Sequence, residues 1–154
     1  MNLILWRHAE AEMGEVDLER GLTRRGFKQA TAIADWLRLH APAGATLMAS
    51  NARRSQQTAT ALSSRFEVVK GLDPERSAQD LLAAVDWPEG GGDSGCVIVV
   101  GHQPTLGRTA ALLLGGAENN WSIRKGAVWW LSNRTRADET ETVLRVALPA
   151  EFLV

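Results

Sequence analysis

The clearest pattern in the chain is a series of short apolar runs, separated by longer segments in which apolar residues recur every three or four positions. Continuous apolar runs of this length are typical of strands that are buried on both faces. Recurrence every three or four positions is typical of helices that pack one face against a sheet. The predicted strands are 2–6, 45–50, 66–70 and 96–100, and a closing hairpin is expected from 127–132 and 142–148, joined by a polar loop.

The segments between these strands carry recognisable signals for the start of a helix. Thr23 is a plausible N-cap for a long helix whose expected buried face is Phe27, Ala30, Ile33, Ala34 and Leu37. A second helix is expected over 51–65. The sequence SAQD at 77–80 fits a capping box that starts a short helix. Pro104 can open a further helix directly after the strand at 96–100.

Strands that alternate with helices predict an α/β fold, with a mostly parallel central sheet covered on both faces in three layers, α/β/α. Residues 1–154 show no repeat, linker or change of composition. The length suffices for a single hydrophobic core. We therefore expect one domain.

Charge and composition narrow the possible partners. The chain has 17 basic and 18 acidic side chains and a net charge of −1. This balance argues against nucleic-acid binding, which usually shows a basic excess, but it allows a small local anion site. No stretch approaches the ~20 apolar residues of a membrane helix, and the first residues lack the features of a signal peptide. We expect a cytoplasmic protein without a membrane partner, in which the single cysteine, Cys96, is buried.

Polar residues follow three of the predicted strands at the point where each strand ends. Arg7 and His8 follow the first strand, Ser50 to Arg54 the second, and His102 comes just after the strand at 96–100. Ligands of parallel sheets bind at the carboxyl ends of the strands. Arginine forks match phosphate oxygens, a neutral imidazole can attack phosphorus, and a second, protonated imidazole can donate to a phosphoryl oxygen. These residues therefore favour phosphoryl chemistry.

Four segments, in the same order, resemble the blocks of the histidine phosphatase superfamily, also called phosphoglycerate mutase-like. The segments DLERGLTRRG and SNARRSQQTA are similar to the family patterns D-x-x-R-x-L-T-x-x-G and S-P-x-x-R-x-x-Q-T-A. The resemblance implies the phosphoglycerate mutase-like fold and a hydrolase that needs no cofactor. The four segments are RHAEAE at 7–12, DLERGLTRRG at 17–26, SNARRSQQTA at 50–59 and VVGHQPTLG at 99–107.

The resemblance also implies roles for individual residues. His8 would be the nucleophile, and Arg7, Arg54 and His102 would complete a pocket that binds the phosphoryl group and assists catalysis. Arg54, rather than its neighbour Arg53, stands at the family spacing after Ser50.

Other residues of the same blocks have roles that the sequence leaves open or assigns to structure. Arg20 could bind substrate at the rim of the pocket, or pair with Asp17 and Glu19 to fix its own loop. Gln57 and Thr58 are expected to have structural roles.

The short chain and the alanine after Arg7-His8 resemble SixA-type phosphohistidine phosphatases. Larger relatives carry a Glu or Asp general acid in an inserted segment. Here the corresponding interval is short, and Asp73 and Glu75 are the only nearby candidates for that acid. A protonated phosphoramidate nitrogen leaves more readily than an alkoxide, so it needs less help from an acid. The expected reaction is hydrolysis of phosphohistidine on a partner protein, in a signalling context.

Two alternatives stay open at this stage. One is a phosphomonoesterase that acts on a small phosphorylated molecule with Asp73 or Glu75 as the acid, and the other is a phosphate-binding module without turnover. In every case we expect phosphate or sulfate to bind between His8 and His102. We expect no metal, because Arg7 and Arg54 would repel a divalent cation.

Overall fold

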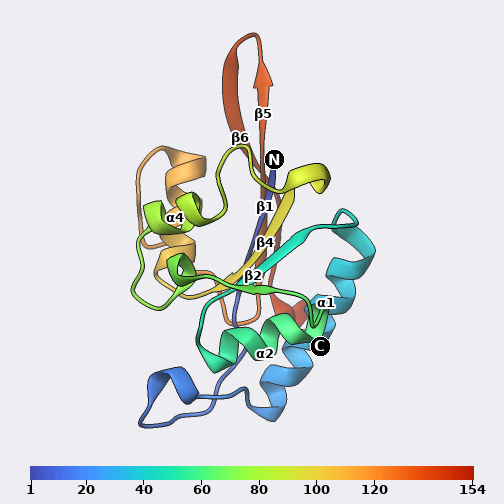
Figure 1. Cartoon of the computed structure of the whole chain (residues 1–154), viewed down its shortest axis with the longest axis vertical. Coiled ribbons are helices and arrows are strands. Elements are labelled where there is room, and N and C mark those ends of the chain that lie inside the picture. Colours follow the sequence, from blue (N-terminus) through green and yellow to red (C-terminus); the bar gives the residue numbers. More distant parts are fainter.

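The computed structural model describes all 154 residues and shows one six-stranded sheet with helices on both sides (Figure 1). The order across the sheet is β3-β2-β4-β1-β5-β6. The pairs β1–β4, β2–β4 and β2–β3 are parallel, whereas β5 is antiparallel to both β1 and β6. The predicted α/β fold with a mostly parallel sheet is confirmed. The strands are β1 (Asn2–Arg7), β2 (Thr46–Ala49), β3 (Glu67–Val68), β4 (Cys96–Gly101), β5 (Val128–Arg136) and β6 (Glu139–Leu148).

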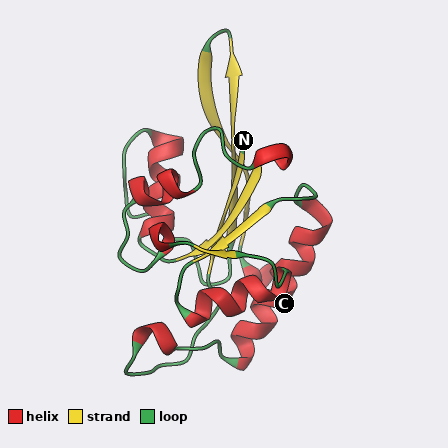
Figure 2. Cartoon of the chain, viewed as in Figure 1, coloured by secondary structure: helices red, strands yellow, loops and turns green.

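Two helices cover each face of the sheet, which gives the three layers seen in Figure 2. One core joins the sheet to the first two helices, and the other joins it to the last two. Short 3₁₀ segments lie at Asp17–Glu19, Lys70–Leu72, Gly92–Ser94 and Ala150–Phe152. The helices are α1 (Arg24–His40), α2 (Arg53–Leu62), α3 (Ala78–Ala84) and α4 (Thr105–Gly115).

Strand β1 lies inside the sheet and contributes to both cores. Successive side chains of a strand point to opposite faces. Ile4 and Trp6 therefore pack in the core beneath α1 and α2, whereas Leu3 and Leu5 pack in the other core, and all four are fully buried. This burial fixes the register of β1, so that the chain reaches the carboxyl edge of the sheet at Arg7.

The predicted helix starts are confirmed. The Thr23 hydroxyl accepts from the Gly26 N–H at 2.9 Å. Ser77 and Asp80 form the expected capping box, with both bonds at 3.0 Å.

The predicted buried face of α1 is wrong at one position, because Phe27 is 47% exposed. Gly26 turns inward instead. A Cβ at Gly26 would lie 2.0 Å from the backbone oxygen of Glu10, so only glycine allows the helix to approach the loop after β1 this closely.

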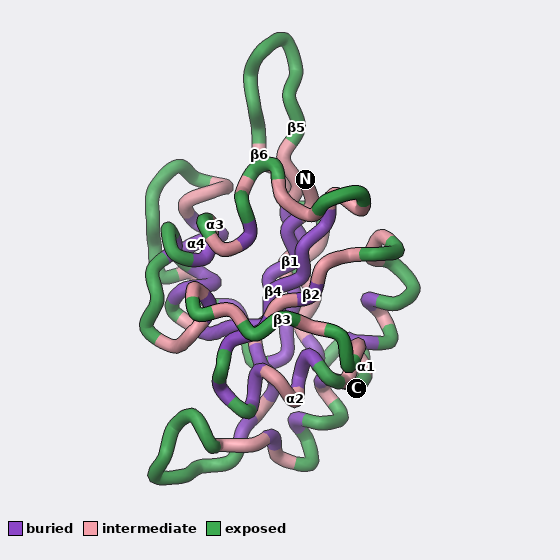
Figure 3. Tube along the Cα trace, in the orientation of Figure 1, coloured by how far each residue is buried: buried purple, intermediate pink, exposed green.

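The polar loop expected between 132 and 142 is also a wrong prediction. Strands β5 and β6 continue as a two-stranded ribbon and turn at Ala137 and Asp138, which both have positive φ. The far part of this hairpin is exposed and extends beyond the sheet, at the top of Figure 3. It has no core to face, so apolar residues do not mark it in the sequence.

Cys96 is fully buried, as expected. Trp130 is buried, while its neighbour Trp129 is only half-buried. Burial raises the pKa of the Cys96 thiol to about 11, so this side chain is chemically inert at neutral pH. None of the helices combines the length and apolar character needed to cross a bilayer.

Candidate active site

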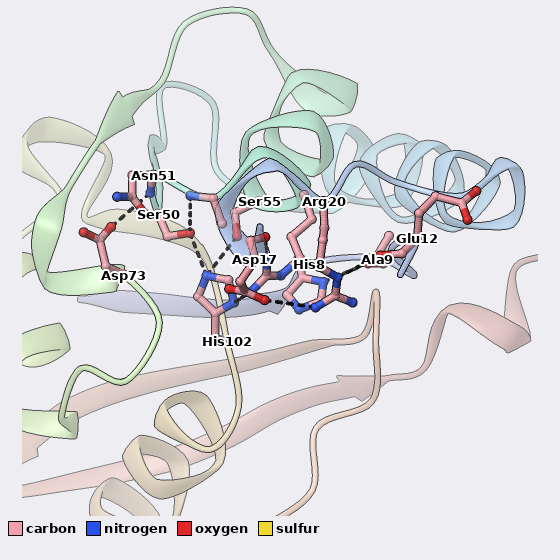
Figure 4. A network of polar contacts seen from close by, with 12 residues as sticks. His8, Ala9, Glu12, Asp17, Arg20, Ser50, Asn51, Ser55, Asp73 and His102 are labelled. Atoms are coloured by element: carbon pink, nitrogen blue, oxygen red, sulfur yellow. Dashed lines mark hydrogen bonds and ion pairs between the residues drawn. The ribbon is translucent and has the colours of Figure 1, made fainter. Parts of the chain in front are cut away.

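The carboxyl ends of three neighbouring strands bring the predicted site residues together. His8 follows β1, Ser50 follows β2 and His102 follows β4, and these strands are adjacent in the order β2-β4-β1. Arg54 is on the first turn of α2, directly after β2. The rings of His8 and His102 lie 5.2 Å apart between centroids (Figure 4). The structure therefore collects residues that are up to 95 positions apart in the sequence (Arg7 and His102) at one edge of the sheet.

The tautomer of His8 follows from one contact. Its Nδ1 lies 2.8 Å from the backbone oxygen of Ala9. A carbonyl oxygen only accepts hydrogen bonds, so Nδ1 carries the proton and Nε2 keeps its lone pair. The pKa of His8 is lowered to about 4, mainly by burial and also by the charges of Arg54 and Arg7, against the opposing effect of the Ala9 bond. At neutral pH His8 is therefore an uncharged imidazole with a nucleophilic Nε2.

His102 is held from both ring nitrogens. Its Nε2 lies 2.7 Å from the Ser50 hydroxyl and 3.3 Å from that of Ser55, and Nδ1 lies 3.4 Å from Nη2 of Arg54. Because a guanidinium only donates, Nδ1 is the acceptor, and Nε2 donates to Ser50.

His102 is uncharged in the free protein, and its protonation in a phosphoryl complex stays a prediction. Burial lowers the pKa of His102 to about 3, and His8 and Arg54 contribute in the same direction, so this imidazole is also neutral. The nearby Asp17 carboxylate raises the pKa of His102 but is outweighed.

The two arginines keep N–H groups free of protein partners. Arg54 is buried, and Arg7 donates from Nη1 to the backbone oxygen of Ile123 at 3.0 Å. Burial lowers the pKa of Arg7, with a smaller contribution from Arg54. The Nε groups of both arginines are buried without any hydrogen-bond partner. Buried guanidinium N–H groups without a protein partner are suited to binding an oxyanion.

Asp17 connects Arg54 to Arg20. Its backbone oxygen accepts from Nη1 of Arg54 at 2.8 Å, and its carboxylate contacts Nη2 at 3.1 Å. The other carboxylate oxygen pairs with Arg20 at 3.1 Å, and Arg20 also donates from Nε to the backbone oxygen of Glu12 at 2.7 Å. Arg20 therefore makes the contacts expected if it fixes its own loop, with Asp17 but not with Glu19 as its partner. Substrate binding by Arg20 stays a prediction.

Helix α2 also fixes the backbone around the site. The Thr58 hydroxyl accepts from the Ala9 N–H at 3.0 Å and donates to the backbone oxygen of Arg54 at 2.8 Å. Gln57 accepts from the Leu22 N–H at 2.7 Å. Both residues thus have the structural contacts expected of them. Arg53, on the same helix, is exposed.

The residue pattern did not predict the contacts of Asp17 with Arg54, or those of Ser50 and Ser55 with His102. A signal for them was present, because Asp17 and Ser50 are the first residues of two of the family-like segments and Ser55 lies within the second. Nothing in the pattern showed which groups they would contact.

The two candidate acids lie in different settings. Asp73 accepts from the backbone N–H of Asn51 at 3.0 Å (Figure 4). Glu75 is exposed. Neither carboxylate hydrogen-bonds to His8, Arg54 or His102. No group of three or more His, Cys, Asp or Glu side chains is arranged to hold a metal ion.

Comparison with known proteins identifies the family. The family model of the histidine phosphatase superfamily (branch 1) matches residues 3–76. A phosphohistidine phosphatase SixA homologue from Haemophilus influenzae is 31% identical over 131 residues, which cover 75% of this chain and 78% of that protein. The chain belongs to the histidine phosphatase superfamily. It is therefore a phosphatase, a hydrolase of phosphoryl groups.

Solved structures of this superfamily share the whole fold. A protein assigned as the phosphohistidine phosphatase SixA of Nakamurella multipartitia is 27% identical with a TM-score of 0.74, over 96% of this chain and 95% of that one. The protein histidine phosphatase SixA complexed with tungstate gives a TM-score of 0.78 at 21% identity, with both chains fully covered. The expected phosphoglycerate mutase-like fold is confirmed.

Proposed function

We propose that this phosphatase hydrolyses the N–P bond of phosphohistidine on a partner protein, through a covalent intermediate on His8. The observation that carries the proposal is the state of His8. Its Nδ1 proton is committed to Ala9, its pKa is low, and its Nε2 is left as a free nucleophile beside Arg54 and His102. Nucleophilic catalysis at phosphorus needs an uncharged imidazole in such a place.

In the first step, Nε2 of His8 attacks the phosphorus in line with the bond to the substrate imidazole. That N–P bond breaks, and its electron pair stays on the substrate ring nitrogen. Because solvent has already protonated the other nitrogen of that ring, the imidazole leaves as a neutral molecule. The free N–H groups of Arg7 and Arg54 donate to the equatorial oxygens as charge spreads over them. In the second step, water attacks the phosphorus, Nε2 of His8 leaves, and inorganic phosphate is released.

His102 changes its role when a phosphoryl group arrives. The positive charges around it contribute to the low pKa of His102, and the negative charge of a phosphoryl group opposes them. Uptake of a proton at Nδ1 then turns that atom from an acceptor into a donor toward the phosphoryl oxygens, while Nε2 stays bonded to Ser50. The protonated His102 of the sequence prediction is thus proposed for the complex.

The choice of an N–P bond rests on the leaving group. An alkoxide needs an acid, whereas a protonated imidazole does not. Asp73, one of the two candidates for such an acid, accepts a hydrogen bond from the backbone N–H of Asn51. The interval between β3 and α3 holds one 3₁₀ turn and no inserted subdomain, which supports access for a histidine on a protein surface. The SixA proteins that are similar to this chain are named as phosphohistidine phosphatases or protein histidine phosphatases.

The test compares the hydrolysis of a phosphohistidine-bearing protein with that of a panel of phosphate esters. Wild type, His8→Ala, Asp73→Asn and Glu75→Gln are assayed in parallel. We expect wild type and both carboxylate variants to prefer the phosphoramidate, and His8→Ala to be inactive. Faster turnover of esters, lost in Asp73→Asn or Glu75→Gln, would instead establish the small-molecule phosphomonoesterase. Phosphate binding without any turnover would establish the non-catalytic module.

A further inference from the structure

A cavity of about 350 Å³ has Arg7 in its lining. Its walls come from the first turns of α1, the turn that precedes β5, and the C-terminal 3₁₀ segment. None of the proposed catalytic residues other than Arg7 lines it. The cavity therefore adjoins the candidate phosphoryl pocket without being part of it.

The turn at 124–127 attaches this cavity to the backbone of the nucleophile. The N–H of Gly126 donates to the backbone oxygens of Arg7 and His8, both at 3.1 Å, and the N–H of Arg7 donates to Ala127 at 3.0 Å. Gly126 has a φ of +77° and a Cβ there would meet neighbouring atoms at 3.3 Å, so the turn requires glycine. Arg124 and Lys125 are thus carried next to the site by backbone hydrogen bonds rather than by a free loop.

The cavity has an excess of positive charge. Four of its lining residues are cations and two are acids. One acid, Glu151, pairs with Arg124 at 3.3 Å, and the other, Glu10, accepts from the Thr23 hydroxyl at 2.9 Å. Arg25 and Lys125 line the cavity and have no ion-pair partner.

We propose that this cavity binds the carboxylate of an acidic side chain that flanks the phosphohistidine on the partner protein. The inference rests on the proposed function and adds a sequence preference to it. A substrate whose phosphoryl group contacts Arg7 places its neighbouring residues at the cavity, where Arg25 and Lys125 supply unpaired positive charge. The volume is at the lower end of the range for ligand sites, which suits one side chain rather than the body of a large ligand.

The experiment uses two phosphohistidine peptides of equal length, one with Glu and Asp beside the phosphohistidine and one with Gln and Asn. Wild type should hydrolyse the acidic peptide with a kcat/KM roughly five- to tenfold higher. The preference should shrink with added salt, because exposed charges are screened over about 8 Å at physiological ionic strength. Arg25→Gln and Lys125→Gln should each lower kcat/KM for the acidic peptide by about two- to fivefold and so reduce the ratio. Arg136→Gln, at the end of β5 by the exposed hairpin turn, makes the same change of charge as a control and should leave the ratio unchanged.

Three results would overturn the inference while leaving the proposed function intact. They are equal turnover of both peptides by wild type, an equal loss on both peptides in the Arg25 and Lys125 variants, or a reduction of the ratio by Arg136→Gln as well. Hydrolysis of neither peptide, with ester turnover retained, would overturn the proposed function itself, and the inference with it.

Discussion

Asp17 contacts Arg54 at two points, through its backbone oxygen at 2.8 Å and through its carboxylate at 3.1 Å. The same carboxylate also pairs with Arg20. The loop after β1 is thereby tied to α2, and the guanidinium of Arg54 is held beside His102. Asp17 is exposed on the outside of this contact while Arg54 is buried, so the loop covers the arginine from the solvent side.

Loss of the Asp17 carboxylate should therefore weaken catalysis through Arg54. Partial burial raises the pKa of Asp17, but hydrogen bonds from Arg54 and Arg20 dominate and lower it, so the side chain is charged at neutral pH. Asp17→Ala removes a charge-assisted hydrogen bond worth about 1–2 kcal/mol, which corresponds to a roughly five- to thirtyfold loss of kcat/KM. Asp17→Asn should lose less, because it keeps an acceptor. Steady-state kinetics on a phosphohistidine peptide measure both.

A matched control for Asp17 exists on α1. Asp35 makes an exposed ion pair with Arg38 at 2.7 Å, with the same three-residue spacing as Asp17 and Arg20. Asp35→Asn should leave kcat/KM unchanged. If Asp17→Ala behaves like Asp35→Asn, Asp17 does not position Arg54.

Thr58 joins the two segments that carry His8 and Arg54. Replacement by valine keeps the shape but leaves the buried N–H of Ala9 without its partner. We expect Thr58→Val to lower the free energy of unfolding by about 1–3 kcal/mol and to reduce turnover. Thr60→Val removes a similar hydroxyl, which donates to Gln56 at 2.8 Å on the exposed side of α2, and should change stability by less than about 0.5 kcal/mol. Denaturant unfolding compares the two, and equal effects would contradict the proposed link.

Acid should destabilise the fold through its two buried histidines. Their pKa values of about 4 and about 3 lie below the ordinary value of 6.5, so the unfolded chain binds more protons as the pH falls below 6.5. The contribution of the two neutral histidines to the free energy of unfolding is fully present above pH 6.5 and is lost toward pH 3–4. The loss at pH 5 is about 1–2 kcal/mol per histidine. Thermal unfolding at pH 7.5 and 5.0, in buffers free of phosphate and sulfate, measures it.

Variants of single histidines test whether this acid sensitivity comes from His8 and His102. His8→Asn and His102→Asn should each show a smaller loss of stability between pH 7.5 and 5.0 than wild type. His40→Asn, which replaces the exposed histidine at the end of α1, is the control and should lose as much as wild type. An unchanged pH dependence in both site variants would show that these histidines are not neutral in the fold.

Much of the site could be predicted because its residues stand directly after the ends of strands in the sequence. Arg7, His8 and His102 come straight after apolar runs that the sheet buries, and the carboxyl ends of neighbouring parallel strands meet. Arg54 follows β2 by one short step into α2. Asp17 could not be placed in the same way, since its contact with Arg54 depends on how an irregular loop folds back over α2.

The two wrong predictions about the fold also concern contacts that the hydrophobic pattern does not describe. The rotation of α1 is set by the close approach of Gly26 to Glu10, a contact that hydrophobic spacing does not describe. The long β5–β6 ribbon is held by cross-strand pairs such as Arg134 with Glu141, which are polar on both sides and therefore read as a loop.

The most direct test of the account is to trap the phosphoryl group on His8. Wild-type protein is mixed with a phosphohistidine peptide, quenched within one turnover at alkaline pH, where phosphohistidine is stable, and digested for mass spectrometry. The account predicts a phosphorylated peptide that contains His8, which disappears on acid treatment and is absent from His8→Ala. Turnover of the substrate by His8→Ala at the wild-type rate, or a phosphoryl group trapped on another residue, would contradict the central role of His8.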